Sequence, residues 1–343
     1  MTGNKRWKRR PERSTWGDWG PDDQLGRLNL LTPQKVLQGI AEVKEGRAFC
    51  LSLPLDLPGG SKLNPRRWPP VLRPTVSDGQ PFFNFRIGHA DPRLTDVVSD
   101  DSVLMCTQYS TQWDSLAHVG SCFDADGDGE PESVYYNGYR ADEHVAGPSG
   151  EGGTSVAHAL GVENMAVKCI QGRAVMVDLE AHFGAARRYV TRADLESVMR
   201  ADNVVVEPGD MVCLNTGFGR MLMGRDGAPS EHDLHHTYSV LDGRDNALLD
   251  WIVESGIAAL IADNYAVEGV PSRPAPEGSY SHPNLPIHDL CLFRLGLNLG
   301  ELWYFSELAD WLRAHGRSRF LLTAPPLRLR GAVGSPASPV ATV

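Results

Sequence analysis

Short apolar runs alternate with amphipathic segments along the chain. Six runs have the length and β-branched content of buried strands, and they cover residues 47–53, 102–108, 173–179, 210–216, 257–263 and 319–324. Four segments place apolar residues at helical spacing, over residues 33–44, 191–200, 244–256 and 305–316. Thr32-Pro33 and the pair Thr191/Asp194 are N-terminal capping patterns for the first two segments. Without a regular βαβ rhythm in the first third, the pattern predicts an α/β fold with a mixed sheet.

Three irregular stretches interrupt this pattern, and composition limits the partners. Residues 56–80, 124–155 and 266–287 are rich in Pro, Gly, Ser and Asp, which is typical of lids and binding loops. The 343 residues are 41% hydrophobic and 22% charged, an ordinary balance for a globular protein. A net charge of −10 argues against a nucleic-acid partner. We expect the substrate to be a small molecule.

The N-terminus departs from this acidic balance. Six basic residues lie between Lys5 and Arg13, so we expect residues 1–15 to form a disordered, solvated tail and residues 16–343 to form the domain. A nucleic-acid- or phosphate-binding arm is the alternative. The tail lacks the apolar core of a secretory signal, and no run of about 18 apolar residues follows, so we expect a cytoplasmic protein without a membrane span. The six scattered cysteines indicate neither a disulfide framework nor a cysteine-rich zinc site.

The stretch 103–121 carries the densest candidate chemistry. Its apolar run ends among Gln108, Thr111, Gln112, Asp114 and His118. In an extended chain, positions 108, 112 and 114 face one side. A carboxylate there is a hard metal ligand, amide oxygens are weaker ligands, and the histidine is either a ligand or a base. The alternative is a strand end whose polar side chains satisfy loop backbone groups, and spacing alone does not separate the two.

Three other groups of residues attract attention as possible sites. Residues 124–135 begin like a calcium-binding loop, but Tyr135 stands where a glutamate ligand is needed, so they indicate an Asp/Gly-rich turn. His232, His235 and His236 fall in an expected loop without a metalloprotease glutamate, which favours surface histidines. His288 and Glu301 bracket an apolar stretch that could place both on one cavity wall, but unaided they do not stand out.

The chain resembles the metal-dependent cyclase family of hydrolases, which includes bacterial kynurenine formamidase, isatin hydrolase and a trans-dienelactone hydrolase. The family hallmark, His-x-Gly-Thr-His-x-Asp-x-Pro-x-His, falls on residues 108–118. Thr111, Asp114 and His118 match it, whereas Gln108 and Gln112 replace the two metal histidines. The resemblance extends over residues 16–343 through segments 19–33, 161–179, 207–219, 260–269, 288–301 and 324–341.

The resemblance implies a swivelling β/β/α fold in a single domain, assembled as a homodimer or homotetramer. It implies a zinc or manganese site, with His118 as a proton shuttle and with metal ligands at Gln108, Gln112, Asp114, His288 and Glu301. Because the glutamines remove imidazoles that zinc prefers, the site could hold one metal, a harder ion or none. The surviving Asp114, His288 and Glu301 favour a retained metal. The Gln-x-x-x-Gln pattern is similar to that of the dienelactone hydrolase branch.

We therefore expect a hydrolase that opens a small cyclic or conjugated lactone or amide with metal-activated water. Aromatic side chains near the hallmark or in the preceding loop are candidates for the walls of a substrate pocket: Trp113, Phe82, Phe83, Phe85 and Tyr135. Two alternatives remain open. One is an arylformamide hydrolase, against which Gln108 and Gln112 count. The other is a metal-free, non-catalytic binding protein of the same fold.

Overall fold

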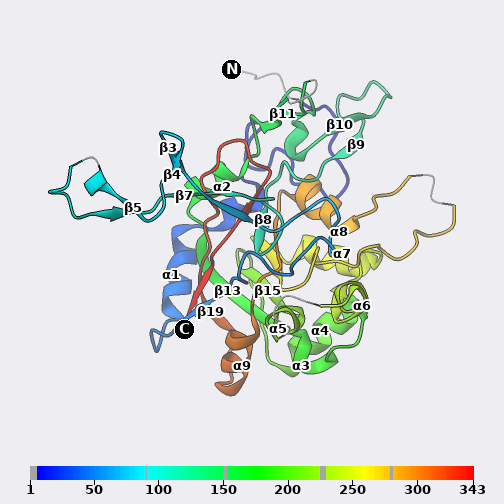
Figure 1. The fold of residues 1–343 in the computed structure, drawn as a ribbon. Coiled ribbons are helices and arrows are strands. Elements are labelled where there is room, and N and C mark those ends of the chain that lie inside the picture. The colour runs from blue at the N-terminus through cyan, green and yellow to red at the C-terminus, as the bar shows by residue number, and fades with distance from the viewer. Residues whose placement is uncertain (1–5, 90, 150–152, 225–228, 279–280) are drawn as a thin grey trace.

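A nine-stranded mixed sheet forms the centre of the molecule (Figure 1). The computed structural model describes residues 6–89, 91–149, 153–224, 229–278 and 281–343. In spatial order the strands are β1 (Ala48–Cys50), β21 (Val340–Thr342), β19 (Arg319–Thr323), β13 (Gln171–Asp178), β15 (Met211–Asn215), β17 (Ala259–Ala262), β18 (Asn298–Glu301), β8 (Gln112–Asp114) and β20 (Gly334–Pro336). The four strands from β13 to β18 are parallel, and all remaining pairs in this sheet are antiparallel. The predicted single α/β domain with a mixed sheet is confirmed.

Two apolar layers cover the sheet because successive strand residues point to opposite faces. On β13, Val175 and Val177 join one core cluster, together with α4 (Arg192–Ala201) and α7 (Asn246–Glu254). The intervening Ala174 and Met176 join the other cluster, together with α2 (Val162–Lys168) and α9 (Ser306–Ala314). The short strands of the parallel centre are buried on both faces, so they appear in the sequence as continuous apolar runs.

The expected helices form where their capping signals stand. Thr32 Oγ1 accepts from the Lys35 amide at the start of α1 (Pro33–Ala41), and Thr191 with Asp194 completes a capping box on α4. Of the predicted strands, five become β1, β13, β15, β17 and β19. The remaining helical segments are η1 (Gly26–Leu30), η2 (Ile87–His89), η3 (Tyr136–Gly138), α3 (Leu179–Phe183), α5 (Phe218–Gly224), α6 (Glu231–His236), α8 (Pro286–His288) and the π-helical η4 (Asp289–Leu295). Among the described residues, no helix combines the length and apolar character needed to cross a lipid bilayer.

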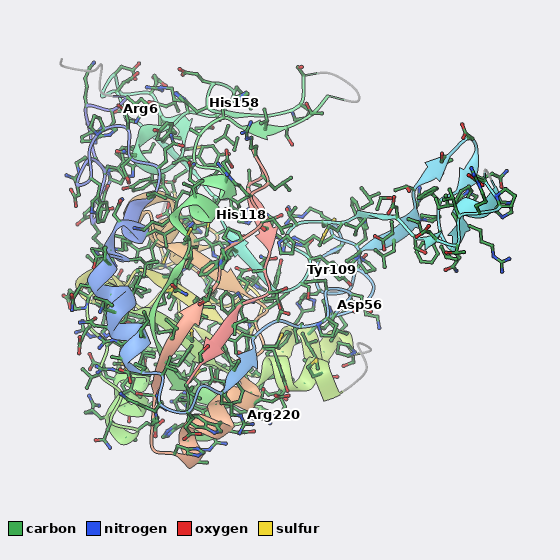
Figure 2. The ribbon with its side chains drawn as sticks, turned by 90° about the vertical axis from the view of Figure 1, so that its left-hand side faces the viewer. Arg6, Asp56, Tyr109, His118, His158 and Arg220 are labelled. Atoms are coloured by element: carbon green, nitrogen blue, oxygen red, sulfur yellow. The ribbon has the colours of Figure 1, made fainter. Side chains whose placement is uncertain are left out.

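The sixth predicted strand, over residues 102–108, is wrong as a buried element. Only β7 (Asp101–Leu104) forms there, and all four of its residues are exposed. It pairs with β2 (Val71–Pro74) at the root of an arm that projects from the body (Figures 1 and 2). The apolar run was misleading because a turn over residues 107–110 separates it from β8, the strand that enters the sheet.

Small ribbons complete the fold outside the central sheet. The arm, residues 68–105 without residue 90, continues from its root into β3 (Val76–Ser77) with β4 (Gln80–Pro81) and β5 (Phe85–Arg86) with β6 (Val97–Val98). The other pairs are β9 (Ser121–Phe123) with β10 (Glu132–Val134), β11 (Val145–Ala146) with β12 (Val156–Ala157), and β14 (Arg188–Val190) with β16 (Ser239–Leu241).

Residues 6–15 lie packed on the domain, which corrects the expected disordered tail for that part. Trp7 is buried, and its indole N–H donates to Asn137 Oδ1 at 3.1 Å. The amides of Lys8 and Arg9 donate to the carbonyl of Ala125, and the Arg9 guanidinium pairs with Asp124. The prediction rested on the basic residues alone. Trp7 lies among them, and its apolar ring packs against the domain. Residues 1–5 lie outside the described residues.

Candidate metal and catalytic site

Two neighbouring strands place three polar side chains on one face of the sheet. Gln112 of β8 pairs with Glu301 of β18, and Asp114 pairs with Leu299. Cross-strand partners share a face, whereas the residue between them points the other way. Gln112, Asp114 and Glu301 therefore project together from the face that carries Leu299. All three are buried at the edge of the apolar layer formed with α4 and α7.

His288 reaches the same point from α8, a single turn that begins at Pro286. Its Nε2 lies 3.2 Å from Glu301 Oε1 and 4.0 Å from Asp114 Oδ2. Asp114, His288 and Glu301 can each offer one ligand atom such that these atoms all lie within 4.8 Å of one another, and all three residues are buried. We call this group the Asp–His–Glu cluster.

Glu268 fixes the orientation of His288 from behind. Its Oε1 accepts from His288 Nδ1 at 2.8 Å and from the His288 amide at 2.9 Å, and its Oε2 accepts from the Ile287 amide at 3.1 Å. A carboxylate that holds one ring nitrogen of a histidine directs the other nitrogen toward a metal position. Glu268 is fully buried and was not among the residues predicted from the sequence. In the sequence it is a lone glutamate five residues after the buried run 257–263, which by itself is no signal of a site.

The amide of Gln112 lies between the two carboxylates of the cluster. Its Nε2 donates to Glu301 Oε2 at 2.8 Å and to Asp114 Oδ1 at 3.4 Å. In this orientation Gln112 Oε1 is buried without a hydrogen-bond partner, and so is Asp114 Oδ2. Buried oxygens without protein partners are rare in folded proteins, and they fit a position where an ion binds.

Gln108 stands beside His118 rather than inside the cluster. Gln108 Nε2 lies 3.1 Å from His118 Nδ1, and Gln108 Oε1 accepts from the Thr107 hydroxyl at 3.0 Å. The other ring nitrogen, His118 Nε2, faces Asp114 Oδ1 at 3.8 Å. Rotating the amide by 180° exchanges its donor and acceptor, and the hydroxyl can serve either orientation. Gln108 can therefore support both tautomers of His118.

The two histidines of the site have opposite electrostatic environments. Burial lowers the pKa of His118 to about 4, helped by the positive charge of His288. Burial alone would also lower the pKa of His288, but its hydrogen bonds to Glu268 and Glu301 raise it to about 10. Burial and the charge of Glu301 raise the pKa of Asp114 well above its ordinary value. His118 is thus a neutral imidazole near pH 7, as a proton acceptor must be.

A loop before the arm brings the Arg67 guanidinium against Gln108, beside the site. The Arg67 guanidinium donates to the backbone carbonyl of Gln108 and lies over the Tyr265 ring at 5.9 Å. Asn64 holds this loop through its bond to the Tyr265 hydroxyl at 3.0 Å. Among the described residues, no carboxylate forms an ion pair with Arg67, although its charge favours the ionised forms of Asp114 and Glu301. Arg67 was not among the residues predicted from the sequence.

The donor set fits a divalent cation. Three carboxylates, those of Asp114, Glu268 and Glu301, face one imidazole in a buried space, which leaves negative charge that burial makes costly. The two oxygens without partners belong to Asp114 and Gln112 and sit at this point. Carboxylate, imidazole and amide oxygen suit zinc or manganese. Asp114, His288 and Glu301 would hold the ion, and Gln112 joins them if its amide is rotated.

Comparison with known proteins gives the family. The family described as "Putative cyclase" matches residues 50–269. A crystal structure described as a novel cyclase is 30% identical in sequence and superposes with a TM-score of 0.74, covering 96% of this chain and 97% of that one. This chain belongs to the cyclase family. No curated protein in the comparison matches the chain.

Isatin hydrolases share the cyclase fold at lower sequence identity. Isatin hydrolase A from Labrenzia aggregata, bound to benzyl benzoate, is 14% identical with a TM-score of 0.54, covering 86% of this chain and 93% of that one. An isatin hydrolase bound to the product analogue thioisatinate is also 14% identical, with a TM-score of 0.52, covering 91% of this chain and 99% of that one.

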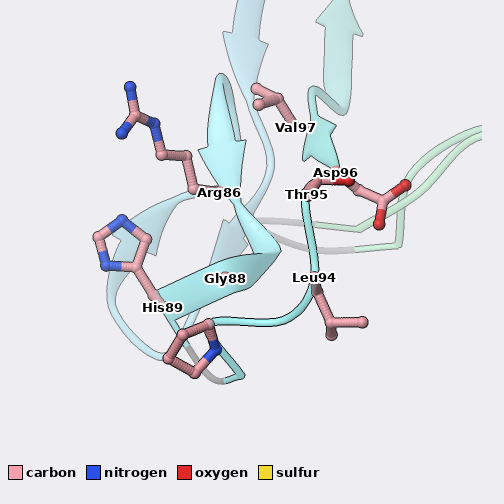
Figure 3. Close-up of a pocket in the computed structure, with 8 residues that line it drawn as sticks. Arg86, Gly88, His89, Leu94, Thr95, Asp96 and Val97 are labelled. Atoms are coloured by element: carbon pink, nitrogen blue, oxygen red, sulfur yellow. The ribbon is translucent and has the colours of Figure 1, made fainter.

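In this cyclase-family chain, most of the aromatic residues expected around the substrate lie elsewhere. Trp113 points to the opposite face of β8, where it is buried against Trp303 and donates to the Ala324 carbonyl. Phe83 and Phe85 belong to the arm, and the hollow of Figure 3 is also part of the arm. Phe82 stacks on Phe85 with ring centroids 4.9 Å apart. Tyr135 is partly buried and packs against the core.

The other two candidate clusters have structural explanations. Asp124, Asp126 and Asp128 lie close together, but Asp124 accepts the amides of Gly127 and Gly129 and pairs with Arg9, as in a closed turn. His232, His235 and His236 are in helix α6 rather than in the expected loop, because Ser230 and Asp233 form a capping box. Neither cluster shares a residue with the Asp–His–Glu cluster.

Proposed function

We propose that this protein is a metal-dependent hydrolase that opens a small cyclic or conjugated lactone or amide. The buried Asp–His–Glu cluster carries the proposal, since it supplies ligands for one divalent ion within 4.8 Å and leaves Asp114 Oδ2 without a protein partner. The relatives named as isatin hydrolases, one bound to a product analogue, support ring opening as the class of reaction. Isatin contains a cyclic amide, so both lactones and cyclic amides belong in the substrate range.

Each residue of the site then has a distinct task. A divalent ion, when bound, polarises a carbonyl and lowers the pKa of water. Asp114, His288 and Glu301 hold this ion, and Glu268 keeps His288 Nε2 directed toward it. His118, neutral near pH 7, accepts a proton at Nε2 and returns it to the leaving oxygen or nitrogen. Gln108 holds its Nδ1 throughout. Arg67, whose charge acts on Asp114 and Glu301, is placed to attract an electron-rich group of the substrate.

Elemental analysis joined to a substrate panel tests this function. The purified protein should contain about one equivalent of zinc or manganese per chain, since one Asp–His–Glu cluster is present. Chelation should abolish hydrolysis of lactones and cyclic amides, and the ion should restore it. A stronger rate on arylformamides would indicate the formamidase alternative. Full hydrolysis by the metal-free protein would refute the metal-dependent mechanism.

Two aspartate variants distinguish the loss of a metal ligand from the general effect of removing a negative charge. Asp114→Asn should remove metal and activity together, because Asp114 is a buried carboxylate of the cluster. Asp126→Asn makes the same chemical change in the other acidic group, at a partly exposed residue. It should retain the metal content and rate of the unmodified protein. Equal loss in both variants would contradict the assignment of the site to the Asp–His–Glu cluster.

A further inference from the structure

The loop that leads from β1 to the arm is fastened to the residues directly before β8. The amide of Leu53 donates to Thr111 Oγ1 at 2.8 Å, and the Tyr109 hydroxyl donates to the carbonyl of Gly60 at 2.8 Å. Figure 2 shows Tyr109 on the side of the molecule from which the arm leaves. The loop is thus held at its start and in its middle, beside the strand that supplies part of the Asp–His–Glu cluster.

Asn64 organises the end of this loop from a buried position. Its Nδ2 donates to the Tyr265 hydroxyl at 3.0 Å, and its Oδ1 accepts from the amide of Arg66 at 3.0 Å. The next residue, Arg67, donates to the carbonyl of Gln108, and its guanidinium lies over the Tyr265 ring at 5.9 Å. One buried amide therefore ties the phenol of Tyr265 to the segment that carries both arginines.

Tyr265 lies next to the strand that supplies Glu301. It follows Asn264, whose carbonyl accepts from the amide of Leu302 at 3.0 Å, and Leu302 follows Glu301. Burial raises the pKa of the Tyr265 phenol, while the charge of Arg67 lowers it and that of Glu301 raises it, so both charges act on the phenol. With a raised pKa the hydroxyl keeps its proton near pH 7. The phenol is therefore a hydrogen-bond donor close to a carboxylate of the cluster.

The donors of this group are only partly used within the described part of the chain. Arg67 makes one hydrogen bond there, to the carbonyl of Gln108, although a guanidinium offers five N–H donors. The Tyr265 hydroxyl accepts one hydrogen bond and donates none to a described residue. No described carboxylate forms an ion pair with Arg66 or Arg67. Burial lowers the pKa of His118, and both arginine charges lower it further, so they act at the proton acceptor of the site. Unused donors and positive charge beside that acceptor suit an anionic group.

We propose that Arg67 and Tyr265 form a subsite for a carboxylate, so that the substrate is a lactone or cyclic amide that carries one; the substrate class rests on the proposed function. A planar guanidinium matches both oxygens of a carboxylate, and the phenol adds a third donor. The exposed Arg66 adds charge that attracts the anion. The alternative is that Arg67 only balances the negative charge of the Asp–His–Glu cluster. In that case its charge matters and its shape does not.

Isothermal titration calorimetry of the purified, metal-containing protein with benzoate tests the subsite without any reaction. Benzoate is a planar carboxylate, and acetophenone is its neutral counterpart. Contact of the benzoate carboxylate with the ion is common to all variants, so differences between variants report the subsite. Arg67→Gln removes charge and shape, and Arg67→Lys retains the charge alone. Arg73→Gln is the matched control, since it makes the same change at an exposed arginine of β2.

Arg67→Gln should raise the Kd of benzoate by about 10–100-fold, and Tyr265→Phe should raise it by about tenfold. Arg67→Lys should recover only part of the loss, because an ammonium group does not bind two oxygens at once. The loss should be confined to benzoate, and Arg73→Gln should bind it as the unmodified protein does. Metal content and thermal unfolding of each variant check that the fold and the ion are retained.

Four results would overturn the subsite: no benzoate binding by the unmodified protein, a Kd in Arg67→Gln within about twofold of it, full recovery in Arg67→Lys, or an equal loss for acetophenone or in Arg73→Gln. Hydrolysis supplies a separate readout. γ-Valerolactone is compared with the lactone in which a carboxylate replaces its methyl group, and Arg67→Gln should lower the ratio of their kcat/KM values by about 10–100-fold. Benzoate binding that depends on Arg67, without hydrolysis of either lactone, would contradict the proposed function and not the subsite.

Discussion

Replacing Glu268 by glutamine is the sharpest test of how the site is built, because Glu268 orients His288 without belonging to the Asp–His–Glu cluster. The carboxylate accepts three N–H donors: His288 Nδ1, the His288 amide and the Ile287 amide. Glutamine keeps the shape and one oxygen. In its better orientation that oxygen retains both bonds to His288, and the new NH₂ group faces the Ile287 amide, so that two donors meet. The variant should still fold, while the hydrogen bonds that orient His288 become weaker.

The magnitude follows from these contacts. Hydrogen bonds to a charged acceptor contribute about 1.5–3 kcal/mol, against about 0.5–1.5 kcal/mol for neutral ones. The weaker bond to His288 Nδ1 therefore removes about 1–2 kcal/mol of the interaction that orients the ring and raises its basicity. Loss of a carboxylate behind a ligating histidine typically lowers metal affinity by about 10–100-fold, or about 1.4–2.7 kcal/mol. Both estimates include an affinity loss on the order of tenfold.

Competition with a chromogenic chelator measures this affinity without any substrate. Glu277→Gln is the matched control, because it makes the same change at an exposed glutamate in the loop before α8. The Glu268 variant should bind zinc about 10–100-fold more weakly, and the control should bind it as the unmodified protein does. Zinc affinity in the Glu268 variant within about twofold of the unmodified protein would refute the positioning role. An equal loss in the control would show that the effect is not specific to His288.

Three further outcomes test the roles of the other side chains. His118→Asn should keep the metal and lower turnover by about 10²–10⁴-fold, whereas loss of metal would make His118 a ligand. Replacing Gln108 and Gln112 together by histidine should tighten zinc binding, because zinc prefers imidazole ligands. The same variant should have a lower turnover, because His118 loses its amide partner. Unchanged zinc affinity would show that neither position reaches the ion. Since the pKa of His288 is about 10 without an ion and that of Asp114 is also raised, zinc binding near neutral pH should release at least one proton and strengthen as pH rises. Calorimetry in buffers of different ionisation enthalpy would contradict this if the heat were the same in all of them.

The sequence determined the local elements where one residue pattern leaves few alternatives. Thr32 and Thr191 begin helices because their hydroxyls satisfy amides that the first helical turn leaves free. The apolar runs of β13, β15 and β17 predict strands since only a covered parallel sheet buries both faces of such runs. The hallmark stretch also supplied Asp114 of the Asp–His–Glu cluster, because a carboxylate, amides and a histidine at close spacing suit an ion.

Only the tertiary structure decided which side chains meet. Glu268 and Arg67 carry no local signal, since a single glutamate or arginine is usually a solvated group. Contacts across the fold bring Glu268 to His288 and Arg67 to the carbonyl of Gln108. Trp113 lies next to Asp114 in sequence, but the pleat of β8 turns it into the opposite core layer. Residues 102–104 have the composition of a buried strand and lie exposed on the arm. Burial depends on what other parts of the chain, or of a second copy, cover, and the pattern of one segment does not contain that information.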